Sequence, residues 1–119
     1  MKRDFDLVRK LLRFFEEKND TKAVLGPSID GYSELEIKYH LVLLHDAKLI
    51  RCEPVISTTS NRVIYVIPFE LTWDGHEFIA TIREDKFWNK VKGYIVDKGG
   101  QLTFNSISIV ATKLMEKIL

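Results

Sequence analysis

Residues 33–50 decide the fold of this chain, and they read Ser-Glu-Leu-Glu-Ile-Lys-Tyr-His-Leu-Val-Leu-Leu-His-Asp-Ala-Lys-Leu-Ile. Ser33 and Glu36 have the spacing of a capping box, in which each side chain bonds the amide of the other residue. Apolar side chains then recur every three or four residues from Ile37 onward. The segment therefore predicts a helix that ends near Lys48.

The residues after this helix predict a β-hairpin. Residues 51–56 and 62–71 are rich in Val, Ile, Tyr and Phe, and five small polar residues at 57–61 separate them. Both faces of the second strand are apolar, so we expect both faces to be covered. Pro54 and Pro68 predict a sheet edge or a bulge at those positions.

Further helices are predicted before the capped helix and after the hairpin. An amphipathic helix follows Asp4 as its N-cap, and others are predicted after Thr72 and Asp85 and from Asn105 or Ser106. The predicted fold class is α+β and winged-helix-like, with several helices and a small antiparallel β-hairpin sheet.

The segment at 22–32 is predicted to be a loop. Gly26, Pro27 and Gly31 disfavour a helix, because proline lacks a backbone donor and glycine costs about 1 kcal/mol in a helix interior. A short strand is expected at 23–25. This leaves little room for the additional helix that a standard helix-turn-helix places before its recognition helix.

Size and cysteine content limit the class of protein. The 119 residues have room for one domain, and no apolar run approaches the roughly 18 residues of a membrane helix. No signal-peptide core follows Met1. Cys52 is the only cysteine, which excludes an internal disulfide and a cysteine-based zinc cage. We expect a cytoplasmic protein without a membrane partner.

Two stretches resemble bacterial winged-helix regulators. Residues 37–50 resemble the recognition helix of those regulators, which carries a similar His-Leu-x-x-Leu-x-x-Ala-Gly-Leu-Ile pattern. Residues 71–75, Leu-Thr-Trp-Asp-Gly, resemble the Leu-Thr-x-x-Gly end of a wing. The resemblance implies a single winged-helix-like domain at 1–119, with a core at 1–83 and a C-terminal helical extension at 84–119.

A closer resemblance extends over almost the whole chain. The residues that carry it are 1–12, 31–33, 39–41 and 71–78. They are similar to an uncharacterised bacterial and phage family labelled domain of unknown function 2513. That resemblance implies a small bacterial or prophage protein, and it offers no functional residues to carry over.

The first functional hypothesis is a DNA-binding or regulatory protein, active in transcription, that binds double-stranded DNA. The predicted nucleic-acid contacts lie on the outer face of the capped helix and on the wing: Lys38, Tyr39, Val42, Arg51, Asn61 and Arg62. Basic wing residues neutralise phosphates or enter a narrow minor groove. Glu34 and Glu36 would repel phosphates, and the net charge of +1 means that binding must rest on local charge.

The second hypothesis is a protein-interaction or dimerisation module on the same scaffold, without DNA binding. The last helix carries more apolar side chains, between Ile107 and Leu119, than a single narrow packing contact would bury. These side chains either cover the hairpin within the chain or form a homodimer through the C-terminal helix.

No catalytic or metal chemistry is predicted. His40 and His45 are five residues apart, which places them on different helix faces, and zinc-binding pairs have a spacing of four. Asp74 to Glu77 stand side by side at a helix start and do not converge on one atom. We therefore predict a protein that is not an enzyme and that needs no cofactor, metal or small-molecule ligand.

Overall fold

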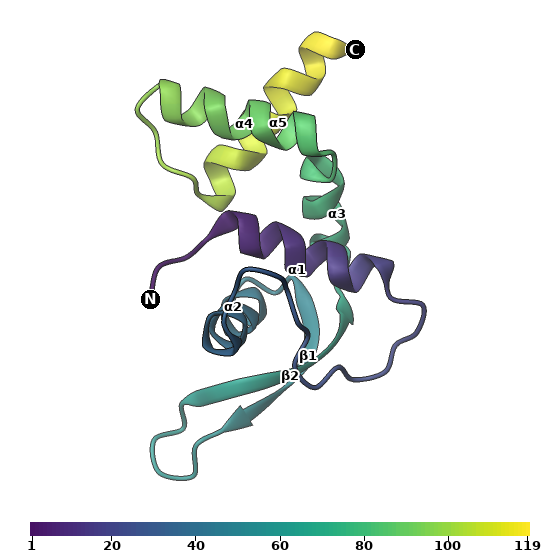
Figure 1. Cartoon of the computed structure of the whole chain (residues 1–119), viewed down its shortest axis with the longest axis vertical. Helices are drawn as coiled ribbons and strands as arrows, with labels where there is room; N and C mark the ends of the chain where they lie inside the picture. The colour runs from purple at the N-terminus through teal and green to yellow at the C-terminus, as the bar shows by residue number, and fades with distance from the viewer. The chain divides into compact units, whose positions relative to one another are not determined.

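The computed structural model describes residues 1–119 as five helices and one two-stranded antiparallel sheet, which confirms the α+β fold (Figure 1). The elements in chain order are α1 (Phe5–Glu17), α2 (Glu34–Asp46), β1 (Ile50–Ile56), β2 (Val63–Leu71), α3 (Trp73–Ile82), α4 (Asp85–Asp97) and α5 (Phe104–Ile118). No helix combines the length and the apolar character that crossing a membrane requires.

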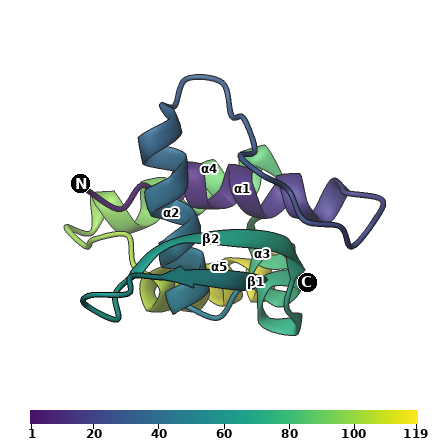
Figure 2. The ribbon, with the colours of Figure 1, turned by 90° about the horizontal axis from the view of Figure 1, so that it is seen from below.

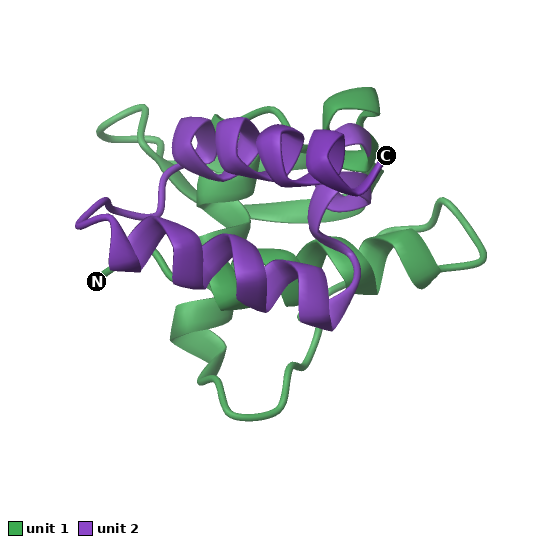
Figure 3. Cartoon of the chain, turned by 90° about the horizontal axis from the view of Figure 1, so that it is seen from above, with its two compact units in different colours: residues 1–76 green, residues 77–119 purple.

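The chain divides into two compact units, residues 1–76 and residues 77–119 (Figure 3). The change from one unit to the other falls inside α3. The single domain inferred from the sequence, with a core at 1–83 and an extension at 84–119, stays a prediction.

In the first unit, α1 and α2 cross each other beside the hairpin (Figure 2). Asp4 caps α1 as predicted, because its carboxylate accepts hydrogen bonds from the amides of Asp6 at 2.8 Å and Leu7 at 3.2 Å. The core of this unit comes from apolar residues spaced at helical intervals along α1 and α2: Leu7, Leu11, Leu12, Phe15, Ile37, Leu41 and Leu44.

The hairpin pairs Ile50 with Leu71 at its base and contains two bulges. The expectation that both faces of β2 are covered is wrong in the outer half of the strand. Ile64 is 58% exposed and Tyr65 is 42% exposed, while Val66 is buried. The hairpin extends beyond the helices that cover its base, so these outer side chains face solvent (Figure 1).

The base of the hairpin is closed by polar contacts around Thr72. The Thr72 hydroxyl donates to the Lys48 carbonyl at 2.7 Å and accepts from the Gly75 amide at 3.0 Å. The Thr72 amide donates to the carbonyl of Leu49 at 3.0 Å. A side chain at position 75 would run into the Leu49 carbonyl, so this position requires glycine. The Leu-Thr-x-x-Gly stretch is therefore a structural junction.

Residues 18–33, which we call the strap, connect α1 to α2 without forming a helix or a strand. The predicted short strand at 23–25 is wrong, because the segment forms a single backbone bond to the sheet, from the Val24 amide to the Pro68 carbonyl at 2.9 Å. Gly26 has a φ of +88°, which turns the chain away from β2 after that bond.

In the second unit, α4 and α5 pack together, and the rings of Phe78 and Phe104 stack with centroids 4.6 Å apart. The predicted start of the last helix at 105 or 106 lies slightly late, because Thr103 is the N-cap and forms a capping box with Ser106. Asp85 was predicted to cap α4, and this prediction is wrong. Asp85 is the first helical residue of α4, where its negative charge interacts favourably with the positive end of the helix dipole.

Candidate functional site

The outer face of α2 carries three of the predicted contact residues. The helix begins at the predicted capping box, in which Ser33 and Glu36 bond each other's amides at 3.0 and 3.1 Å. The Lys38 ammonium lies 3.0 Å from the Glu34 carboxylate, and the Lys38 side chain is 52% exposed. Tyr39 and Val42 are half-buried. The charge that Lys38 would offer to a phosphate is therefore partly neutralised.

The hairpin carries the other three predicted contact residues. The Arg51 guanidinium donates to the Leu71 carbonyl at 3.1 Å and lies 3.9 Å from the Glu70 carboxylate. Asn61 and Arg62 are exposed at the turn, where Asn61 adopts a φ of +57°. At about 3.3 Å per strand residue, Arg51 and the turn are roughly 17 Å apart. The structure does not bring these three side chains together, and the six contact residues stay predictions.

His40 is a structural residue, and only 1% of it is exposed. Its Nε2 accepts from the Asp4 amide at 2.8 Å, and its Nδ1 lies 2.8 Å from the Glu36 carbonyl. Because an amide can only donate, Nε2 accepts and Nδ1 carries the proton. The imidazole thereby connects the start of α1 to α2, and neither nitrogen is left for a metal.

His45 and Cys52 form a second contact, with Nδ1 3.2 Å from Sγ. Cys52 is half-buried, and burial raises the pKa of its thiol. A thiol with a raised pKa is a poor nucleophile at neutral pH, since the thiolate is the reactive form. No three His, Cys, Asp or Glu side chains gather in a way that could hold a metal ion.

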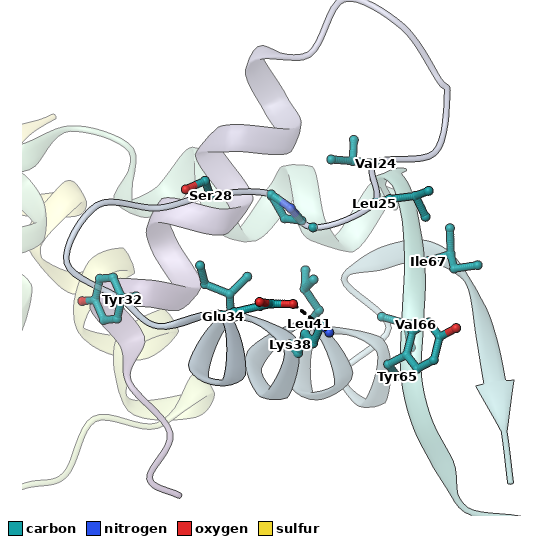
Figure 4. A pocket seen from close by; sticks show the side chains of 13 residues that line it. Val24, Leu25, Ser28, Tyr32, Glu34, Lys38, Leu41, Tyr65, Val66 and Ile67 are labelled. Carbon is teal, nitrogen blue, oxygen red and sulfur yellow. Dashed lines mark ion pairs between the residues drawn. The ribbon is translucent and has the colours of Figure 1, made fainter.

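A groove with a volume of about 630 Å³ lies between the strap, α2 and β2 of the first unit (Figure 4). This volume lies within the range of about 300 to 1,000 Å³ that is usual for binding sites. Its apolar walls come from all three segments: Leu25, Pro27, Ile37, Leu41, Tyr65 and Ile67. We call this cavity the groove.

Polar and charged side chains also line the groove, among them Ser28, Tyr32, Glu34 and Lys38. The Glu34–Lys38 ion pair lies along the α2 side, and the Tyr32 ring lies at the opposite end from β2 (Figure 4). Burial, and then the nearby carboxylate of Asp4, raises the pKa of the Tyr32 phenol, which therefore stays protonated at neutral pH. The only charged side chains that line the groove, those of Glu34 and Lys38, are paired with each other, which suits an uncharged ligand better than a phosphate.

The groove is not among the sites that the sequence predicts. Two signals point toward it in retrospect: the apolar residues on both faces of β2, and Pro68, which marks an open sheet edge. Neither signal indicates that the strap crosses β2 at Val24 and then leaves it at Gly26. That path depends on tertiary contacts of a loop, which local patterns do not report.

Comparison with known proteins confirms the resemblance to the family labelled domain of unknown function 2513. Residues 2–101 match a family described as "Hypothetical protein (DUF2513)". A protein of Haemophilus influenzae, named "Uncharacterized protein", is 33% identical over 120 residues, which cover 100% of this chain and 99% of that relative. No solved structure matches the chain.

Proposed function

We propose that this chain, which belongs to the family described as "Hypothetical protein (DUF2513)", is a protein-interaction module that binds a partner through the groove of its first unit. The observation that carries the proposal is a groove with a mixed apolar and polar lining, at which large side chains remain exposed, among them Leu25 at 82% and Tyr65 at 42%. Apolar surface that is clustered and exposed marks interaction sites. The proposal assigns no catalysis to the chain.

The distribution of charge supports a protein partner over a nucleic acid. Two of the three predicted basic contacts, Lys38 and Arg51, lie within 4 Å of acidic side chains of the same chain. DNA binding depends on cations that replace the counterions of phosphates, and internally paired cations contribute less to that exchange. We place the module in the cytoplasm, where the lone thiol of Cys52 remains reduced.

Photo-crosslinking in bacterial cells tests the proposal. A benzophenone amino acid at position 65 lies in the groove, and one at position 59 lies at the hairpin turn and serves as the control. We expect an adduct from position 65 whose increased mass on a denaturing gel is unchanged by nuclease. Absence of a protein adduct at position 65, or a nuclease-sensitive adduct at position 59 alone, would overturn the proposal.

DNA binding is the second candidate function, and the polar hairpin turn favours it. Ser57 bonds the amides of Thr59 and Ser60 through its hydroxyl, and Arg62 is exposed beside them. Such a turn resembles a wing that contacts phosphates. For this candidate we expect anisotropy with random duplex DNA to show binding that weakens steeply with salt. An Arg51→Ala, Arg62→Ala double variant would then lose affinity.

Self-association through α5 is part of the same class of function. Apolar side chains along this helix remain exposed, including Ile109 at 59% and Ile118 at 62%. Burying them against a second copy is favourable at about 25 cal/mol per Å² of apolar area. We expect light scattering after size exclusion to report a dimer that Ile118→Asp converts to a monomer. A monomeric wild-type chain at high concentration would contradict this.

A further inference from the structure

We infer that the groove accepts an extended segment of the partner, which pairs as an additional strand with the open edge of β2 at Val66. This inference rests on the proposed function and specifies the conformation and chemistry of the partner. Strand addition to an exposed sheet edge is a recurring mode of peptide recognition, in which main-chain bonds give affinity and alternate side chains give specificity.

The pairing of the two strands identifies the open edge. Pro54 pairs with Val66 and Cys52 pairs with Pro68, so both prolines occupy pairs of the same parity in the ladder. In an antiparallel ladder, hydrogen-bonded residue pairs alternate with pairs that form no hydrogen bonds to each other. Because proline has no N–H to donate, both proline-containing pairs belong to the pairs without hydrogen bonds between β1 and β2. The main-chain groups of Val66 and Pro68 therefore point away from β1, toward the opposite edge of β2.

The strap shows that this edge accepts a main-chain partner. The Val24 amide donates to the Pro68 carbonyl on that side at 2.9 Å. The Lys18 ammonium secures the contact, because it donates to the carbonyls of Lys22 and Phe69, each at 2.6 Å, and its side chain is only 11% exposed. One main-chain hydrogen bond of the kind that pairs neighbouring strands therefore already exists beside the groove.

The strap does not pair with Val66, the next residue of β2 whose main-chain groups point to this edge. Gly26, with its φ of +88°, turns the chain out of line, and no backbone bond joins the strap to Val66. Val66 nevertheless lines the groove, and the pairing of the ladder directs its amide and carbonyl away from β1, which leaves one donor and one acceptor without a strand partner. A peptide strand supplies both complementary groups and continues the pairing that Val24 begins, whereas a small apolar ligand supplies neither.

The walls define which side chains the strand carries. Residues directly opposite each other on neighbouring strands point to the same side of the sheet. Because Val66 is buried, the partner residue that pairs with it points to the buried side of the sheet. Leu41 of α2 lies near Val66 (Figure 4), and Ile37 of the same helix also lines the groove. We therefore assign the partner an uncharged stretch with aliphatic residues at alternate positions.

A defined peptide tests the main-chain part of the inference. The probe is a terminally blocked heptapeptide of alternating threonine and valine, and its control is the same peptide with an N-methyl group on the central valine. Titrated into the full chain labelled with ¹⁵N, the probe should shift the Val66 amide resonance and slow its hydrogen exchange. The N-methyl control, which cannot donate to Val66, should bind about tenfold more weakly. Equal affinity of both peptides would overturn strand pairing and leave a purely apolar site.

A matched pair of variants tests the location. Tyr65 lines the groove, and its neighbour Ile64 is similarly exposed on the same strand but does not line it. Both positions tolerate substitution because they contribute little to the core. We expect Tyr65→Glu to weaken peptide binding about tenfold and Ile64→Glu to change it less than twofold. Equal effects, or no binding of the probe at millimolar concentration, would overturn the inference. If the crosslink at position 65 still captured a protein, the proposed function would stand without the strand pairing.

Discussion

The two ends of the hairpin differ in how fully their main-chain groups are hydrogen-bonded. At the base, Leu71 is 1% exposed, and the hydroxyl of Thr72 both donates and accepts a hydrogen bond. In the outer half, Ile64 and Tyr65 are exposed, and the edge of β2 at Val66 has no strand beside it. The base holds the fold together, and the outer half is the part that has main-chain groups left for a partner strand. The following substitutions test this difference, from the largest expected effect to the smallest.

Adding a methyl group at Gly75 should be the most damaging change at the base. Gly75→Ala directs its Cβ into the Leu49 carbonyl, and we expect a loss of about 2 to 3 kcal/mol in the free energy of unfolding. The matched control is Gly93→Ala in α4, where a Cβ meets nothing within 4 Å. That variant should gain about 0.5 to 1 kcal/mol. Urea denaturation of both variants measures the difference, and equal stabilities would contradict the closed base.

Removing the hydroxyl of Thr72 should cost less. Thr72→Val preserves the shape and leaves the Lys48 carbonyl and the Gly75 amide without their partner. We expect a loss of about 1 to 2 kcal/mol in urea denaturation. Thr72→Ser keeps the hydroxyl and should retain most of the stability. If serine and valine were equally destabilising, the hydrogen bonds would not be the cause.

Relieving the backbone at Lys48 should stabilise the base. Lys48 adopts a φ of +62°, at the position where the winged-helix pattern has glycine. We expect Lys48→Gly to gain about 1 kcal/mol, because a left-handed conformation costs other residues about that amount. Asn61→Gly is the matched substitution at the turn, where φ is +57°, and it should change stability less because asparagine tolerates this region. Thermal unfolding of the two variants provides the test.

Replacing an apolar side chain in the outer half should have almost no effect on stability. We expect Ile64→Thr to alter the free energy of unfolding by less than about 0.5 kcal/mol, since the residue is 58% exposed. Chemical denaturation measures this. A loss above 1 kcal/mol would show that Ile64 packs against other residues and that the outer half belongs to the core.

Acid should weaken the start of α2 through Glu36. Its hydrogen bonds to Ser33 hold the pKa of the Glu36 carboxyl below the ordinary value of 4.5. The stabilisation is complete above pH 4.5 and is lost as the pH falls through the lowered pKa of the folded state. Glu36→Gln keeps a capping-box partner and removes this titration. We expect a slightly smaller fall in melting temperature between pH 5 and pH 3 in the variant than in the wild-type chain.

Local chemistry explains which parts of the molecule could be predicted from the sequence. The Ser33–Glu36 capping box, the Asp4 cap and the hairpin follow from short-range preferences, and the structure contains them. The predicted cap of α4 at Asp85 was wrong: aspartate is a preferred N-cap residue, but the helix begins one residue earlier, with Glu84 at the cap position and no side-chain hydrogen bond there. The groove could not be predicted, since it depends on where a strap without regular structure crosses a sheet edge.

The neutral imidazole of His40 makes the contact between α1 and α2 observable in solution. Its Nδ1 proton is held against the Glu36 carbonyl in a side chain that solvent hardly reaches. A ring proton in this position exchanges slowly enough with water to give a separate nuclear magnetic resonance signal. Disappearance of that signal at a temperature where the amide signals of the core remain would report that solvent reaches the contact between α1 and α2 before the whole chain unfolds, without any added label.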